Sequence, residues 1–126
     1  MNRSLHWITL AAGLLGFTGV ALGAFGAHAL KQHLGADQLA TFEVGVRYQM
    51  YNALGMIVVA LLVTSGRARS TWPGWAMQVG IVLFTGSLVG LATTGAKVFG
   101  PFTPLGGAAF LVGWIGLAVG LRRERS

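Results

Sequence analysis

Residues 7–30 read WITLAAGLLGFTGVALGAFGAHAL, an apolar run with no charged residue between Arg3 and Lys31. At ~1.5 Å per residue, an α-helix of this length exceeds the ~30 Å hydrocarbon core of a bilayer. The run is also too long for the apolar region of a secretory signal peptide, although Ala27-His28-Ala29 has the pattern of a cleavage site. It therefore predicts a membrane-spanning helix.

Three further apolar segments follow along the chain. Asp37 to Phe42 is amphipathic and is expected to lie at the membrane interface before the second span begins. The third and fourth spans each start with a threonine cap and a first-turn proline, at Thr71 and Pro73 and at Thr103 and Pro104. The sequence thus predicts an all-α, integral membrane four-helix bundle. It forms a single transmembrane domain, residues 1–126, with spans of about 7–30, 44–64, 73–92 and 104–121.

Composition supports a membrane protein and excludes several other classes. The chain is 54% hydrophobic and only 10% charged, whereas soluble domains are about 25% charged. A soluble protein of 126 residues could not bury so much apolar surface. The net charge of +6 comes from basic residues spread over short loops and the tail, so no nucleic-acid partner is predicted and the partner is the lipid bilayer. Cysteine is absent, which excludes disulfides and thiol catalysis.

Charge asymmetry predicts the orientation in the membrane. Four crossings place both termini and the middle loop on one side, and that side is the more basic. It holds Arg3, Arg67, Arg69, Arg122, Arg123 and Arg125, whereas the other side holds Lys31, Lys97 and, near the boundary, Arg47. The positive-inside rule therefore predicts that both termini are cytoplasmic.

Small residues recur every three or four positions along the first and fourth spans. A period of about 3.5 residues places them on one helix face, where a neighbouring helix can approach closely. We expect packing within the chain at these faces, and a homo-oligomer contact is the alternative. The predicted packing residues are Gly16, Gly19, Gly23, Gly26, Gly106, Gly113, Gly116 and Gly120.

Polar residues gather near the outer ends of the predicted spans. Such groups are costly in hydrocarbon and usually face the bundle or a watery cavity, so we expect them to meet. The candidate outer polar cluster consists of His28, Glu43, Arg47, Tyr48, Asn52 and Lys97. Gln49 is two residues from Arg47, cannot share its helix face, and is expected to point away from this cluster.

At each of these positions, a purely structural role is an alternative to a role in a functional site. Glu43 and Arg47 have the spacing of a helical ion pair, and Tyr48 fits an aromatic belt. Gln49 and Asn52 suit hydrogen bonds between helices. No metal site, cofactor or catalytic residue is predicted, because the histidines form no metal-binding motif and no phosphate-binding loop is present.

Several motifs give the chain a family resemblance. They are Gly23-Ala-Phe-Gly-Ala-His-Ala-Leu30, Arg47-Tyr-Gln-Met-Tyr51 with Ala53-Leu54, Phe84-Thr-Gly-Ser-Leu88, Thr94-Gly95, and Thr103-Pro-Leu-Gly-Gly107 with Gly113-Trp114. In this order they resemble the bacterial family called domain of unknown function 423, which is similar to eukaryotic transmembrane protein 256. The resemblance implies a small four-helix protein of the bacterial inner (plasma) membrane and no established activity. The family pattern commonly has histidine where this chain has Asn52, which weakens any mechanism that needs an imidazole there.

Three functions are compatible with these features. We favour a non-enzymatic accessory, assembly or lipid-contacting bundle, with a homo-oligomer or another membrane protein as its protein partner. A small-solute transporter or channel component is the second hypothesis. The third is an enzyme acting on a lipid or quinone at the outer leaflet, with His28 and Glu43 as acid and base.

The orientation can be tested with a fusion. A reporter attached after Ser126 should be active only if it is of a type that works in the cytoplasm, because the basic residues favour that side. Activity of a periplasmic reporter at the same fusion point would contradict the predicted orientation.

Overall fold

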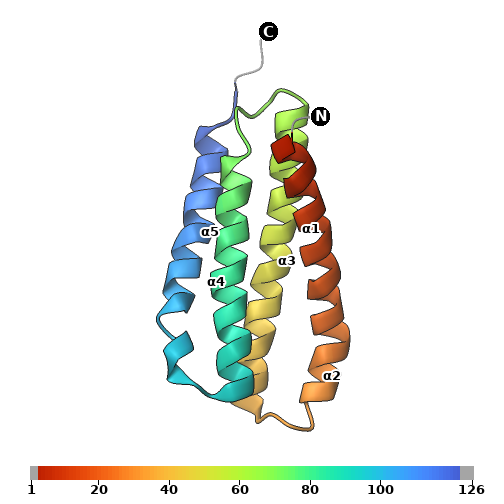
Figure 1. Cartoon of the computed structure of the whole chain (residues 1–126), viewed down its shortest axis with the longest axis vertical. Helices are drawn as coiled ribbons and strands as arrows, with labels where there is room; N and C mark the ends of the chain where they lie inside the picture. Colours follow the sequence, from red (N-terminus) through yellow and green to blue (C-terminus); the bar gives the residue numbers. More distant parts are fainter. Residues whose placement is uncertain (1–2, 123–126) are drawn as a thin grey trace.

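The structure, a computed structural model, describes residues 3–122 except for the side chains of Phe25 and Ala27. Its elements are α1 (Arg3–Ala21), the π-helical turn η1 (Leu22–Gly26), α2 (Ala27–Leu30), α3 (Ala36–Thr64), α4 (Trp72–Thr94), the short 3-10 helix η2 (Lys97–Phe99) and α5 (Phe102–Val119) (Figure 1). The fold is therefore all-helical. Arg123 and Arg125, which contribute to the predicted basic side, lie outside the described residues.

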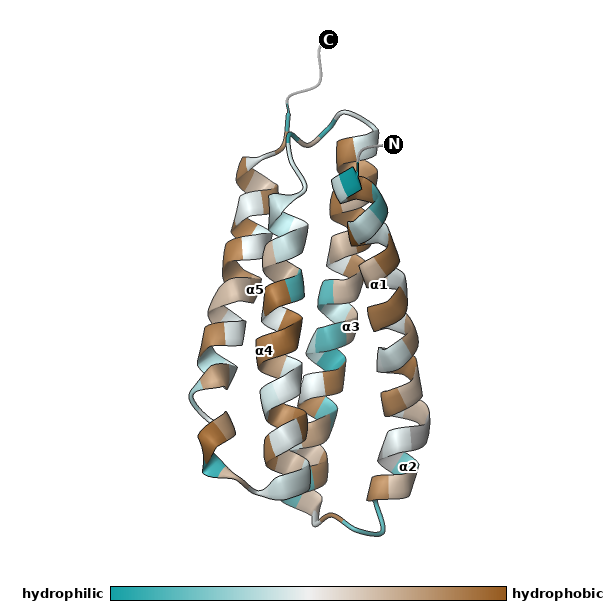
Figure 2. Cartoon of the chain, in the orientation of Figure 1, coloured by the Kyte–Doolittle hydropathy of each residue, from teal (hydrophilic) through white to brown (hydrophobic). Residues whose placement is uncertain are grey.

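Four helical stretches of the described chain are long and apolar enough to cross a membrane. They are Arg3–Leu30, Ala36–Thr64, Trp72–Thr94 and Lys97–Val119. α3 is the longest single helix, and its 29 residues correspond to ~43 Å, more than the ~30 Å that hydrocarbon requires. Hydrophilic residues also occur along the middle of α3, not only in the loops (Figure 2).

The helices are arranged as an open row rather than a closed square. α1 packs mainly on α3, α3 on α4, and α4 on α5. α1 and α5 consequently lie on opposite sides of the central α3–α4 pair (Figure 1). Buried side chains from all four long helices form the larger apolar core, which includes Ile8, Met56, Met77 and Phe110. A smaller buried cluster around Phe42 joins α3 to α4.

Both ends of the described chain lie at the end of the bundle where the loop between α3 and α4 turns (Figure 1). The Ser4 hydroxyl is hydrogen-bonded to that of Thr71 and accepts a hydrogen bond from the Trp75 indole nitrogen at 2.9 Å. The backbone nitrogen of Arg69 donates to the carbonyl oxygen of Gly120, and that of Arg122 donates to the carbonyl oxygen of Arg67. These bonds tie three distant segments together.

The two threonine caps differ from the sequence prediction. Thr71 does precede α4, but its side chain makes no capping bond to the helix and contacts Ser4 instead. α5 begins at Phe102 after Pro101, so Thr103 lies inside its first turn. The Thr103 hydroxyl is hydrogen-bonded to that of Ser87 in α4 at 2.6 Å. Both hydroxyls thus join helices instead of capping them.

The predicted glycines of α5 lie against α4. A Cβ atom at Gly106 would be 2.5 Å from the backbone nitrogen of Phe84, and one at Gly113 would be 2.8 Å from the carbonyl oxygen of Pro73. At Gly116 it would overlap the Trp72 ring. Gly120 follows the helix, and its Cβ would meet only the carbonyl oxygens of the last turn of α5.

The predicted glycines of the first span differ in how closely they approach α3. A Cβ at Gly19 would overlap the flexible end of Met50, whereas Gly23 and Gly26 leave 3.4 Å to Val46 and 3.2 Å to Phe42. Gly16 has no atom within 4 Å of the Cβ position. α1 therefore approaches α3 closely at Gly19, and Gly16 faces away from the contact.

Adjacent glycines in α5 provide a matched test of the α4–α5 contact. Gly106→Ala should lower the free energy of unfolding by about 1–3 kcal/mol, because the backbone of Phe84 must move. Gly107→Ala meets nothing within 4 Å and should be neutral or stabilise by up to about 1 kcal/mol through helix propensity. Unfolding in detergent measures both values, and equal effects would contradict the close contact.

Candidate functional site

An open groove of about 740 Å³ lies between α3 and α5, with α4 beneath it. It exists because α3 and α5 make few contacts with each other while both pack on α4. Its lining is predominantly aromatic and aliphatic. The lining residues are Val44, Tyr48, Tyr51, Asn52, Leu54, Phe84, Gly107, Phe110, Leu111 and Trp114.

Helical spacing explains how these residues come to line one groove. Val44, Tyr48, Tyr51 and Asn52 follow an i, i+4, i+7, i+8 pattern in α3, which places them on one stripe. Gly107, Phe110, Leu111 and Trp114 follow an i, i+3, i+4, i+7 pattern in α5. The two stripes face each other because the glycines of α5 fix its contact with α4.

Asn52 joins the two walls of the groove. It is only 2% exposed, and its Oδ1 atom accepts a hydrogen bond from the Trp114 indole nitrogen at 3.0 Å. Its Nδ2 atom donates to the carbonyl oxygen of Tyr48 one turn earlier, at 2.9 Å. An unpaired amide would be costly in this position, and the two bonds satisfy one donor and one acceptor of the side chain.

Aromatic rings form the rest of the groove. Tyr48 lies parallel to Phe110 at a centroid distance of 6.4 Å and contacts Phe84 at 5.2 Å and Tyr51 edge-on at 5.6 Å. Phe84 and Phe110 are 5.3 Å apart. These geometries are the favourable ones for aromatic pairs. The groove is thus a preformed aromatic surface with a single buried amide.

The structure does not bring all six residues of the predicted outer polar cluster together. Tyr48 and Asn52 lie together in the groove. Glu43, Arg47, Lys97 and His28 are exposed and are not among its lining residues. A functional role for the four exposed residues therefore stays a prediction.

Gln49 has a different position. Its side chain is 3% exposed, and its Nε2 atom donates to the carbonyl oxygen of Leu15 at 2.8 Å and to the Thr18 hydroxyl at 2.9 Å. Gln49 therefore points away from the groove and toward α1. Gln49 thus forms hydrogen bonds between helices, which is the structural role considered for it from the sequence.

Several residues of structural interest have no clear sequence signal. Phe84, Phe110 and Leu111 look like ordinary residues of an apolar span. The repeated spacing of aromatic residues with Gly107 is the pattern that could have identified the groove. In the described residues, the Gln78 side-chain oxygen is buried without a hydrogen-bond partner, and no group of three or more metal-ligating side chains occurs.

The Asn52–Trp114 hydrogen bond can be measured with a double-mutant cycle. Trp114→Phe and Asn52→Leu should each destabilise the fold, with a coupling free energy of about 0.6–1.7 kcal/mol for hydrogen bonds between membrane helices. Trp7→Phe is the control, because Trp7 is 55% exposed. Additive single effects would mean that this bond contributes nothing to holding α5 against α3.

Comparisons with known proteins agree with this architecture. Residues 22–107 match the family described as "Protein of unknown function (DUF423)". The chain is 48% identical over 102 residues to the UPF0382 membrane protein YwdK of Bacillus subtilis, covering 79% of this chain and 83% of that protein. It is 43% identical over 122 residues to a UPF0382 membrane protein of Haemophilus influenzae, covering 95% and 96%.

A third relative is the UPF0382 inner membrane protein YgdD of Escherichia coli, 38% identical over 121 residues that cover 94% of this chain and 91% of YgdD. No solved structure matches the chain. The family match covers well over half of the sequence, and the relatives are similar along nearly their full length. The chain therefore belongs to the DUF423 family of membrane proteins, whose function is unknown.

Proposed function

We propose that this protein is a non-enzymatic, lipid-contacting accessory protein of the inner membrane that holds the apolar tail of a membrane lipid in the groove between α3 and α5. The observation that carries the proposal is the preformed aromatic groove of about 740 Å³, within the usual size range of small-molecule sites. The groove lies along helices apolar enough to cross a membrane, so hydrocarbon chains are the molecules most available to fill it.

The chemistry of the groove favours a hydrocarbon chain over a polar ligand. Its walls present aromatic rings, and the one buried amide, Asn52, already has partners in Trp114 and Tyr48. The Tyr48 and Tyr51 hydroxyls are the remaining polar side-chain groups of the lining, too few to bind a large polar ligand. Isoprenoid or acyl chains gain mainly from contact with flat apolar surfaces, and such a surface is what Tyr48, Phe84 and Phe110 provide.

Transport and catalysis receive less support from the same observations. A conducting path requires polar groups or carbonyl oxygens along its length, whereas this groove is apolar and opens to the side of the bundle. Catalysis by His28 and Glu43 requires these side chains to meet at a pocket. Both are exposed and outside the groove.

We also propose that the protein has the membrane orientation expected from its charged residues. Both termini and the α3–α4 loop lie at one end of the bundle, and Arg3, Arg67, Arg69 and Arg122 come from these segments. The positive-inside rule supports a cytoplasmic location for that end. The two ends of the groove then lie within the membrane, open to lipids on one side.

Filling the groove tests the proposal. Gly107 lines it, and a Cβ atom there would meet nothing within 4 Å, so Gly107→Leu should place its side chain in the groove and obstruct it. Gly13→Leu is the matched control, because Gly13 also has nothing within 4 Å and lies on α1. The measurement is mass spectrometry of lipids that remain bound after purification in mild detergent.

We expect Gly107→Leu to lose the lipid bound in the groove, so that fewer lipids are retained per protein, and Gly13→Leu to retain as many as the wild type. Both variants should give folded protein in equal yield. Equal lipid retention by the wild type and both variants would contradict lipid binding in the groove. Retention of a hydrophilic solute that Gly107→Leu removes would favour transport instead.

A further inference from the structure

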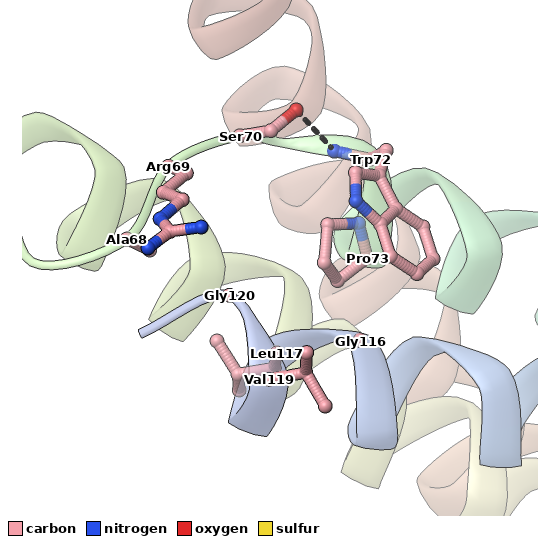
Figure 3. A pocket seen from close by; sticks show the side chains of 9 residues that line it. All are labelled: Ala68, Arg69, Ser70, Trp72, Pro73, Gly116, Leu117, Val119 and Gly120. Atoms are coloured by element: carbon pink, nitrogen blue, oxygen red, sulfur yellow. Dashed lines mark hydrogen bonds between the residues drawn. The ribbon is translucent and has the colours of Figure 1, made fainter. Parts of the chain in front are cut away.

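A second cavity lies at the end of the bundle that carries both termini, away from the groove. Its volume is about 210 Å³, below the usual range for a complete small-molecule ligand. The α3–α4 loop forms one wall, the first turn of α4 another, and the last turns of α5 the floor (Figure 3). The lining residues are Ala68, Arg69, Ser70, Trp72, Pro73, Gly116, Leu117, Val119 and Gly120.

The walls of this cavity are held by specific contacts. The backbone nitrogen of Arg69 donates to the carbonyl oxygen of Gly120 at 3.2 Å, which fixes the loop against the end of α5. The Ser70 hydroxyl accepts a hydrogen bond from the backbone nitrogen of Trp72 at 3.3 Å. The Trp72 ring lies so close to Gly116 that a Cβ atom there would overlap it. The cavity is therefore built by the fold and is not a gap between mobile side chains.

Three hydrogen-bond donors at the cavity are available to a ligand. The Arg69 guanidinium and the Trp72 indole nitrogen have no hydrogen-bond partner among residues 3–122. The Ser70 oxygen accepts from Trp72, but its own proton has no acceptor within that part of the chain. A cavity with three donors unpaired within residues 3–122, one of them cationic, suits an anion with several oxygen atoms.

The surroundings increase the preference for an anion. Arg122 is joined to the same loop through its backbone, which donates to the Arg67 carbonyl oxygen at 2.7 Å. Asp37 and Glu43, the acidic residues within the described range, lie in the first half of α3, toward its other end. Glu124 lies outside the described residues. Positive charge of this kind at the end of a membrane helix attracts anionic lipids.

We propose that this cavity binds the phosphate head group of an anionic phospholipid, with Arg69, Ser70 and Trp72 as donors. The apolar part of the cavity determines the source of the phosphate. Leu117 and Val119 line it beside the indole of Trp72, and Trp72 is 50% exposed, as is usual for tryptophan at a membrane interface. A phospholipid can place its phosphate at the loop and its chains along α5, whereas free phosphate gains nothing from the apolar wall.

This site is independent of the α3–α5 groove. The cavity uses Gly116 and Val119 of α5, whereas the groove uses Gly107, Phe110, Leu111 and Trp114. Loss of lipid from one site therefore does not imply loss from the other. Gly107→Leu should leave binding at this cavity unchanged.

The experiment titrates the full-length protein in detergent with phosphatidylglycerol or phosphatidylcholine and counts bound lipids by native mass spectrometry. We expect tighter binding of phosphatidylglycerol and about a fivefold loss of that binding in Arg69→Gln, the effect of one arginine near anionic lipid. Lys31→Gln is the control, because it removes the same charge from an exposed residue at the opposite end. It should leave the affinity unchanged.

A second variant keeps the test decisive if Arg69→Gln folds poorly. Trp72→Phe removes the indole N–H donor together with part of the ring that lies against Gly116, and it should weaken phosphatidylglycerol binding by at least about threefold, the value of one hydrogen bond. Equal binding of the two lipids, or equal losses in Arg69→Gln and Lys31→Gln, would overturn the site. Displacement of the lipid by millimolar inorganic phosphate would overturn the assignment to a phospholipid and indicate a site for a soluble anion.

Discussion

The close contact between the backbones of α4 and α5 is the constraint on which the rest of the structure depends. Lipid chains are as apolar as leucine, so membrane helices associate through van der Waals contact and hydrogen bonds rather than through hydrophobic burial. A Cβ atom at Gly106 or Gly113 would meet backbone atoms of α4 at 2.5 and 2.8 Å, and backbone atoms cannot move aside as side chains can. This contact fixes the rotation of α5, and the rotation directs Phe110 and Trp114 toward α3.

Hydrogen bonds from polar side chains fix the register of each helix pair. Glycine contacts alone would allow one helix to slide along the other. The Thr85 hydroxyl donates to the carbonyl oxygen of Gly45 at 3.0 Å between α4 and α3. Ser87 and Thr103 join α4 to α5, Gln49 joins α3 to α1, and Asn52 joins α3 to α5. Each bond is worth about 0.6 kcal/mol on average in membrane proteins. Their main effect is therefore on specificity, because a shifted register would leave a polar group unpaired in an apolar interior.

The four spans could be predicted from the sequence because an apolar run of about 20 residues with at most one charge is typical of a membrane-spanning helix and rare elsewhere. The packing of Gly106 and Gly113 was also predictable from their spacing. The groove was not, because it depends on the relative rotation of α3 and α5, which no single helix specifies. The depth of a residue along a span likewise does not show which way its side chain points. His28 and Asn52 were placed in one layer by counting residues, yet one is exposed and the other is buried.

The open row of helices explains why this small protein presents so much structured surface to lipid. In a closed bundle α5 would pack on α1, and the aromatic stripe of α5 would be covered by another helix. Here α5 is held by α4 alone along most of its length, so the stripe stays open as the wall of the groove. The same helix ends beside the arginine-bearing loop, where its last turns form the floor of the cavity lined by Arg69 and Trp72. A rigid α4–α5 pair thus gives one small chain two different surfaces, an aromatic one along the helices and a cationic one at their end.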